Sequence, residues 1–254
     1  MEVDISNRKA VEEAVTGGIG ALVPVSQQPL TPTVFGSQKA FEGRINYPYL
    51  NTAFAVGRLG EAGYTPGQLV LSGGDENVIL YTPISQVNKN QSNPVSTIIL
   101  NYAQYWKEYA FREGEAAKVF ASREEAHTAG FTTEWDNAAG RPASAPPAMR
   151  WLLLLARPEG VESGFFCVPS ADGRMWAPAY MNVERTAYRE VSTTFGLTER
   201  ATRASGRGLH SVLWDLTTRL WKSKSNTNST WVPKLTKIKD LTDEEITNLV
   251  GKMS

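Results

Sequence analysis

Cysteine and histidine are scarce in this sequence, which has one cysteine and two histidines among 254 residues. A single cysteine cannot form an intramolecular disulfide, and two distant histidines without a cysteine cluster make a poor zinc site. Cys167 stands in the apolar run Gly164–Val168, which predicts a buried and unreactive thiol. We expect His127 on the surface of a short helix and His210 within a basic segment. The scarcity of cysteine fits a reducing cytoplasm, in a bacterial or an infected host cell.

Long hydrophobic runs are also missing. The longest run, Trp151–Ala156, is far shorter than the ~20 apolar residues that span a bilayer, and it suits a buried strand instead. The amino terminus, Met1–Asp4, is polar and acidic, unlike a signal peptide. We therefore expect a cytoplasmic protein without a membrane partner.

Catalytic motifs are absent as well. The sequence has no Walker A loop, no dinucleotide-binding glycine motif after a strand, no zinc-protease motif and no nucleophile elbow. The glycine cluster Gly17–Gly20 follows no predicted strand, so we interpret it as a flexible turn. These absences predict a protein that is not an enzyme and that needs no cofactor and no metal. An enzyme whose catalytic carboxylates cannot be paired from sequence is the alternative.

The total charge is zero, with 26 Lys and Arg against 26 Asp and Glu, but the charges are distributed unevenly along the sequence. The segment Arg185–Lys239 holds eleven Lys and Arg against three Asp and Glu, and aromatic residues lie among these cations. A protein that binds single strands needs cations for phosphates and flat rings for bases, so this composition favours a nucleic-acid-binding surface. An ordinary solvated face is the competing interpretation.

The predicted binding residues are the cations and rings of this segment. They are Arg185, Tyr188, Arg189, Arg203, Arg207, Arg219, Trp221, Lys222, Lys224, Trp231 and Lys234. Two basic loops, Ser205–Gly208 and Ser223–Asn226, are placed to close over a strand. Trp221, which precedes a lysine and a polar turn, is the strongest stacking candidate. Trp214 alternates within an apolar run and is expected in the core, whereas Trp231 either stacks on a base or plugs a barrel end.

Strand patterns dominate the chain between residues 65 and 240. Strands are expected at Gln68–Leu71, Val78–Tyr81, Arg150–Ala156, Gly164–Pro169, Arg174–Tyr180, Ser211–Leu220 and Thr230–Leu235. The turns Gly73–Asn77 and Ser170–Gly173 predict hairpins, and Pro233 places the last strand at a sheet edge. Residues 97–109 fit either a longer strand or a strand followed by a helix.

Two capping boxes predict helix starts. Ser122 with Glu125 opens a helix that ends at Gly130, and Thr242 with Glu245 opens the last helix. The acidic residues Asp243–Glu245 favour the helix dipole, and they are also suited to occupy the basic surface when nucleic acid is absent.

We predict a mainly β fold, an OB-like barrel with two or three short helices and long loop insertions, with an α+β sheet as the alternative. Three parts are expected along the chain: a Pro-rich extended arm at residues 1–50, an OB-like nucleic-acid-binding domain at 51–240, and a short acidic helix at 241–254.

A set of motifs spread over residues 65–250 carries a family resemblance. They are Phe120–Ala126 followed by Gly130, Arg150–Ala156, Gly164–Phe166, Trp176–Tyr180, Tyr188–Arg189 and Trp231–Leu235. Together they resemble the divergent single-stranded DNA-binding proteins of bacteriophages and mobile elements. The resemblance implies an OB-type core, sequence-independent binding that protects replication or recombination intermediates, homo-oligomers, and replication or recombination proteins as partners. The sequence departs from that family in lacking a long acidic carboxy-terminal tail.

The function expected from the sequence is therefore binding of single-stranded DNA, with RNA as an alternative ligand. A phage structural or assembly protein that does not bind nucleic acid is the second candidate, because the Pro-rich arm and the many loops suit contacts between subunits.

Overall fold

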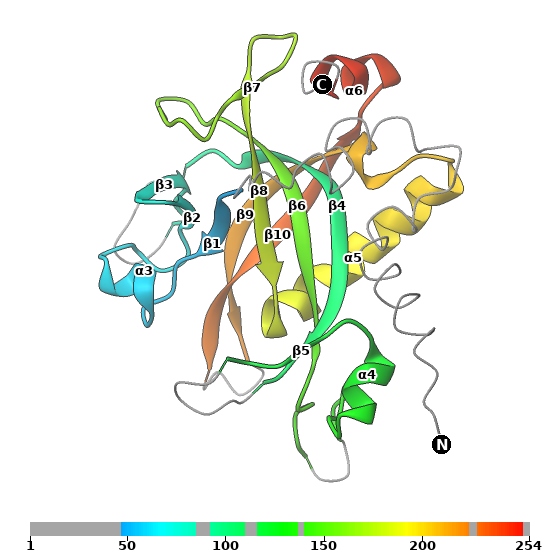
Figure 1. Ribbon diagram of the computed structural model, residues 1–254. Helices are drawn as coiled ribbons and strands as arrows, with labels where there is room; N and C mark the ends of the chain where they lie inside the picture. Colours follow the sequence, from blue (N-terminus) through cyan, green and yellow to red (C-terminus); the bar gives the residue numbers. More distant parts are fainter. Residues whose placement is uncertain (1–46, 85–91, 110–115, 137–139, 224–227, 251–254) are drawn as a thin grey trace, which may run out of the picture.

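A strongly curled sheet that wraps around one long helix forms the body of the protein (Figure 1). The computed structural model describes residues 47–84, 92–109, 116–136, 140–223 and 228–250. The strands are β1 (Tyr49–Thr52), β2 (Leu69–Gly73), β3 (Glu76–Tyr81), β4 (Val95–Lys107), β5 (Val119–Phe120), β6 (Pro147–Ala156), β7 (Val168–Pro169), β8 (Met175–Val183), β9 (Val212–Lys222) and β10 (Ser229–Asp240). The helices are α3 (Arg58–Glu61), α4 (Arg123–Thr128), α5 (Arg185–Ala204), the 3₁₀ turn η3 (Leu209–Ser211) and α6 (Asp243–Val250). The predicted mainly β class is confirmed, as a half-barrel.

The strand order is β10-β9-β4-β6-β8-β1-β2-β3, with β5 beside β4 and β7 beside β8. All pairs are antiparallel except β1 with β8. The three long strands β4, β6 and β8, which are separated in the chain only by the two-residue strands β5 and β7 and by α4, lie side by side. The chain then passes through α5 to β9, which returns to pair with the start of β4. A fourth strand that returns beside the first of three consecutive strands is a Greek-key connection.

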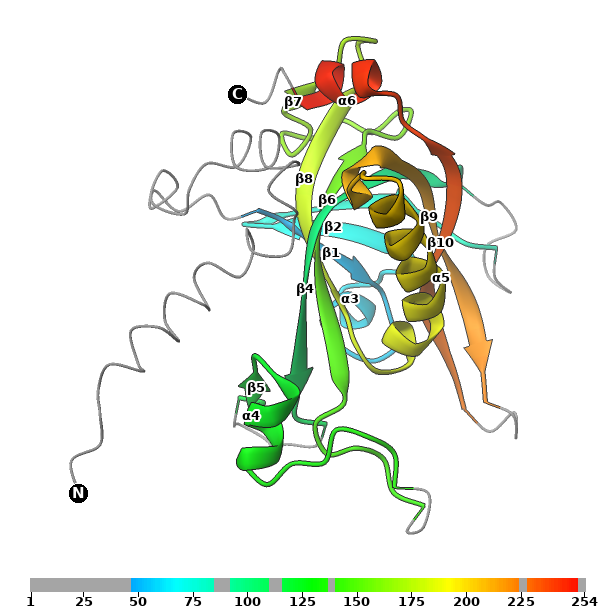
Figure 2. The same ribbon diagram turned by 90° about the vertical axis from the view of Figure 1, so that its right-hand side faces the viewer.

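The inner face of the sheet, defined as the face that packs on α5, holds the main core. β6 sends Trp151, Leu153 and Leu155 to this face, and none of the three is exposed to solvent. The ring of Phe195 from α5 stacks on Trp151 with the centroids 5.6 Å apart. Large rings bury much apolar area, so this contact fixes α5 in the curl of the sheet. Figure 2 shows α5 on one side of β4 and β6.

The outer face, opposite α5, has a second and smaller core where α6 covers one end of the sheet. Leu154 and Trp176 alternate with the inward residues of β6 and β8, and they pack with Ile246 and Leu249 of α6. Because both faces of β6 are covered at this end, the uninterrupted apolar run Trp151–Ala156 is explained by burial on two sides.

Several predicted local structures are confirmed. The hairpin β2–β3 turns at Gly74, and the hairpin β7–β8 turns at residues 170–173. Ser122 accepts a hydrogen bond from the backbone N–H of Glu125, 3.1 Å away, and α4 is followed by Gly130 at φ +84°. The Thr242 hydroxyl likewise accepts from the Glu245 N–H at 3.2 Å, and the Glu245 carboxylate accepts from the Thr242 N–H at 2.8 Å. Among the described strands β10 pairs only with β9, so Pro233 does lie in an edge strand.

Of the two alternatives for residues 97–109, the longer strand is observed, because residues 95–107 form one continuous strand and no helix follows Tyr102. Other expectations need correction. Only Val168 and Pro169 of the strand expected at Gly164–Pro169 are extended, because the preceding residues turn. Cys167 lies in that loop and is exposed, so the predicted buried thiol is wrong.

The expected division of the chain meets the structure only in part. Most of the arm predicted at 1–50 lies outside the described residues, and the boundary after residue 50 falls inside β1. α6 packs on the sheet through Ile246 and Leu249, and Leu241 just before it joins the same cluster, so the described part of the last segment shares the core of the half-barrel. No helix in the described part of the chain is long and apolar enough to cross a bilayer.

Candidate nucleic-acid interface

Three tyrosines gather on the outer face of the sheet, beyond the end that α6 covers. Tyr180 projects outward from β8, because Ala179 and Met181 on either side of it point into the inner core. The ring of Tyr49, from the neighbouring β1, lies 5.8 Å from the Tyr180 ring in a tilted arrangement. The ring of Tyr47 meets Tyr180 edge-on at 5.6 Å. Tyr49 is 38% exposed, and the other two are half-buried.

An arginine from the next strand completes this surface. Arg150 alternates with Met149 and Trp151 of the inner core, so its side chain points to the outer face of β6. Its guanidinium carbon lies 6.0 Å from the centre of the Tyr180 ring. Its Nε donates a 2.9 Å hydrogen bond to Oδ1 of Asn182, the residue opposite it on β8. We call Tyr47, Tyr49, Tyr180 and Arg150 the tyrosine face.

Two phenol groups of this face, those of Tyr47 and Tyr180, remain protonated at neutral pH. Burial raises the pKa of Tyr180, with a further contribution from Tyr49 that outweighs the opposing charge of Arg150. Burial likewise raises the pKa of Tyr47. Neutral rings beside one guanidinium are suited to stacking on bases next to a phosphate, because no phenolate is present to repel the phosphate.

A hydrogen-bonded cluster borders the tyrosine face at the end of β4. The Tyr105 hydroxyl donates to Glu184 Oε1 at 2.8 Å, and Lys107 Nζ lies 2.9 and 3.0 Å from the two oxygens of that carboxylate. Burial first, and then Glu184, raise the pKa of Tyr105 far above its ordinary value. The cluster ties the end of β4 to the start of α5. It also neutralises Glu184, so Arg150 remains as the uncompensated charge of the tyrosine face.

The residues predicted from sequence fall into separate groups. Arg185, Arg189 and Arg203 are exposed along α5, whereas Tyr188 turns inward, packs on the core and accepts a 3.2 Å hydrogen bond from Gln104 Nε2. The Arg185 guanidinium lies 4.7 Å from the centre of the Tyr109 ring, and its Nη2 donates to the Tyr109 carbonyl at 3.0 Å.

The second group belongs to the β9–β10 hairpin. It comprises Arg219, Trp221, Lys222, Trp231 and Lys234. Arg219 forms an ion pair with Glu190, while Lys222 and Lys234 are exposed. Trp221 and Trp231 are half-buried, and Trp231 packs against Gly67, as the plug interpretation expects. Lys224 and the loop Ser223–Asn226 lie largely outside the described residues.

Arg207 stands apart from both groups because it holds α6. Its Nη2 donates to the carbonyl of Leu241 and lies 3.1 Å from Asp243 Oδ1. Trp214 is fully buried, as predicted, and Phe195 is sealed in the core beside Trp151. The described cations and rings of the basic segment therefore do not line one trough. For example, Arg219 of the hairpin pairs with Glu190, and Glu190 lies about 100° around α5 from Arg189, so Arg219 and Arg189 lie on different sides of the helix.

The tyrosine face was not predicted from the sequence, although part of its pattern is visible there. Arg150 and Tyr180 sit in two runs correctly predicted as strands, at positions that alternate with apolar residues. That alternation places each side chain on the face of its own strand that is opposite the apolar residues. It does not say that β6 pairs with β8, or that β1 brings Tyr49 beside them, because pairing between distant segments leaves no local pattern.

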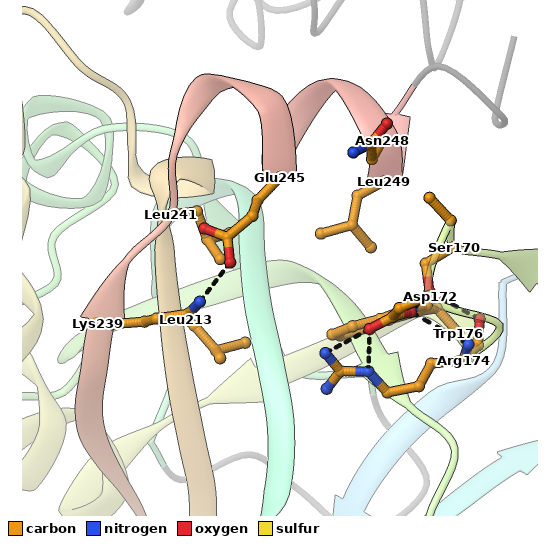
Figure 3. Close-up of a pocket in the computed structure, with 11 residues that line it drawn as sticks. Ser170, Asp172, Arg174, Trp176, Leu213, Lys239, Leu241, Glu245, Asn248 and Leu249 are labelled. Atoms are coloured by element: carbon orange, nitrogen blue, oxygen red, sulfur yellow. Dashed lines mark hydrogen bonds and ion pairs between the residues drawn. The ribbon is translucent and has the colours of Figure 1, made fainter.

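A cavity lies elsewhere, beneath α6. It has a volume of about 210 Å³, and Trp176, Leu213 and Leu249 form its apolar walls. Figure 3 shows two ion pairs at its rim, Asp172 with Arg174 and Glu245 with Lys239. The Ser170 hydroxyl, followed by Arg174, lowers the pKa of Asp172 to about 2. The charges at the rim cancel, so this cavity does not add to a phosphate-binding surface.

The described residues hold no group of three His, Cys, Asp or Glu side chains that is arranged for a metal ion. His127 is exposed, with Nε2 2.8 Å from the Thr133 hydroxyl. Burial, and then the charge of Arg207, lower the pKa of His210. Comparison of the chain with protein-family models, with curated proteins and with solved structures finds no match.

Proposed function

We propose that this protein binds single-stranded DNA without sequence preference, through the tyrosine face, on an OB-type half-barrel. The observation that carries the proposal is the cluster of Tyr47, Tyr49 and Tyr180 around one surface arginine, Arg150. Rings that lie on an exposed sheet face accept bases of any sequence, because every base has a flat face to stack. Each stacked base contributes ~1–3 kcal/mol, so two or three rings suffice for substantial affinity.

The topology of the sheet supports the OB-type interpretation. The strands β4, β6, β8, β9 and β10 form a five-stranded Greek-key unit, with α5 between its third and fourth strands. An OB fold is a partly open five-stranded Greek-key barrel that binds oligonucleotides on the face of its second and third strands. β6 and β8 occupy those two positions here, and they carry Arg150 and Tyr180. Strands β1 to β3 are an addition to such a unit.

Titration with oligo-dT of about 16 nucleotides at several salt concentrations tests the proposal. The double variant Tyr49→Leu and Tyr180→Leu keeps apolar bulk but removes two stacking rings. We expect the Kd to rise roughly 5- to 150-fold for each ring that stacks on a base. Phe54→Leu is the matched control, because Phe54 is an aromatic residue that is 45% exposed in the loop after β1.

Absence of binding by the unmodified protein at low salt would refute the proposed function. Equal affinity for oligo-U would extend the ligand to RNA. Light scattering with and without the oligonucleotide tests the homo-oligomer that the family resemblance implies. Large assemblies formed without nucleic acid, together with no binding, would favour the structural-protein alternative. Replication or recombination proteins remain the proposed partners.

A further inference from the structure

We propose that one flank of α5 binds the phosphates of the same single strand after it leaves the tyrosine face. The inference rests on the proposed function and specifies the path of the ligand. It concerns four arginines, Arg185, Arg189, Arg200 and Arg203, which we call the arginine stripe.

The stripe follows from helical geometry. Residues 185, 189, 192, 196, 200 and 203 are spaced as one face of a helix repeats, by four or three positions. Every charged residue on this line is an arginine, while Ser192 and Gly196 between them are small. The line runs nearly the whole length of α5, about 27 Å at 1.5 Å per residue. A backbone can approach closely where the side chains are small, and it meets guanidinium groups at both ends.

Two of these arginines are available for phosphate. Arg189 and Arg200 are exposed, and in the part of the chain that the structure describes neither forms an ion pair. Three other cations of the basic segment are occupied, because Arg219 pairs with Glu190, Lys237 with Asp240 and Lys239 with Glu245. Arg203 is shared with Glu199, and Arg185 lies over the Tyr109 ring. A free guanidinium gains more from a phosphate than a paired one does.

One β-strand, β4, separates the arginine stripe from Arg150 of the tyrosine face. β9 pairs with β4 only from Val95 to Ile98, and β5 pairs with it only at Trp106 and Lys107. Between these points, on the side away from β6, no described strand covers the edge of β4. Gln104 bonds to Tyr188 of α5, whereas Ala103 is exposed opposite Arg150. β4 therefore shows one side to the tyrosine face and the other to α5, at a width of about 5 Å.

The path around this edge selects a single strand over a duplex. A ligand that touches both surfaces must bend sharply over β4, and duplex DNA resists such bending over its persistence length of about 150 base pairs. A single strand bends freely, and it can stack bases on one surface while its phosphates lie along the other.

The double variant Arg189→Gln and Arg200→Gln tests the path. With an oligonucleotide of about 16 nucleotides, the slope of log K against log salt should become shallower by about 1.4, because each phosphate contact contributes about 0.7 for single strands. With an oligonucleotide of about 4 nucleotides, which fills only the tyrosine face, the slope should not change. Arg58→Gln with Arg157→Gln is the control, since it removes two exposed arginines, one on α3 and one after β6, that likewise form no ion pair among the described residues.

Each other outcome is decisive. An unchanged slope with the longer ligand, in a protein whose affinity still falls in the Tyr49→Leu variant, would remove the stripe from the path and leave the proposed function standing. An equal change of the salt slope with the long and the short oligonucleotide would mean that the short one already reaches the arginine stripe, which would overturn the proposal that the tyrosine face is filled first. Failure of the unmodified protein to bind either ligand would refute the proposed function itself.

Discussion

Trp231 lies against the backbone of Gly67, and the fit between them leaves no room for a side chain at position 67. A Cβ there would lie 2.5 Å from Cδ2 and 2.7 Å from Cε3 of the indole. The glycine also has φ +91°, a conformation that costs energy for any other residue. Trp231 thus closes the end of the half-barrel between β10 and the start of β2, which is a structural task independent of stacking on bases.

Gly67→Ala should lower the free energy of unfolding by about 1–3 kcal/mol, because the ring must shift and the backbone becomes strained. Urea denaturation measures the loss. Gly164→Ala is the control, since nothing lies within 4 Å of its Cβ and its φ is not positive. We expect little change there. If Trp231→Leu lowers oligo-dT affinity without lowering stability, Trp231 is a stacking residue after all.

At the scale of elements, α6 depends on the sheet for its stability. Eight residues are too few for an isolated helix in water, so the helix is held by its capping box and its apolar side. Ile246 and Leu249 supply that side and cover Ile98, Leu100 and Trp176 on the outer face. The cavity of about 210 Å³ beside Leu249 shows that the cover is incomplete. Ion pairs from Arg207 and Lys239 hold the acidic end of the helix.

Ile246→Ala should therefore release much of the contact between α6 and the sheet, at a cost of about 2 kcal/mol or more in stability. Asn248→Ala, on the exposed side of the same helix, should cost less than about 0.5 kcal/mol. Thermal unfolding compares the two variants. Equal stability of both would show that α6 contributes nothing to the fold. Hydrogen exchange should then find the amides of α6 unprotected even in the unmodified protein.

α5 shows what sequence patterns could and could not predict. Capping boxes and hairpin turns act over a few residues, so the helices capped by Ser122 and Thr242 and the hairpin that turns at Gly74 were predictable. The helix at 185–204 was overlooked because its threonines, serine and glycine are poor helix formers. Yet its buried residues Val191, Phe195 and Thr202 recur with the helical period. Testing that period would also have aligned the four arginines on one face.

At the scale of the whole molecule, the candidate interface is assembled from segments that are far apart in the sequence. Tyr49, Arg150 and Tyr180 come from three strands, and the arginine stripe comes from a helix that follows them. Net charge is zero, so long-range attraction of DNA is weak and local placement decides binding. Composition identified a basic segment, but the fold divides its cations between α5, the β9–β10 hairpin and the loop before η3, where Arg207 pairs with Asp243 of α6. This division could not be predicted without the strand order.

A surface that combines rings with few free cations should distinguish strongly between single strands and duplexes. Duplex DNA offers phosphates, but its bases remain stacked on one another and cannot reach Tyr49 or Tyr180. In competition against a labelled oligo-dT, an unlabelled single strand should displace the label at a concentration at least roughly 5-fold below that of the matching duplex, since each lost stacked base costs ~1–3 kcal/mol. In the double variant Tyr49→Leu and Tyr180→Leu this preference should shrink, because the contribution of Arg150 and the arginine stripe to phosphate binding remains. Equal displacement by both competitors would mean that the protein holds nucleic acid by phosphate contacts alone, and that the tyrosine face serves another purpose.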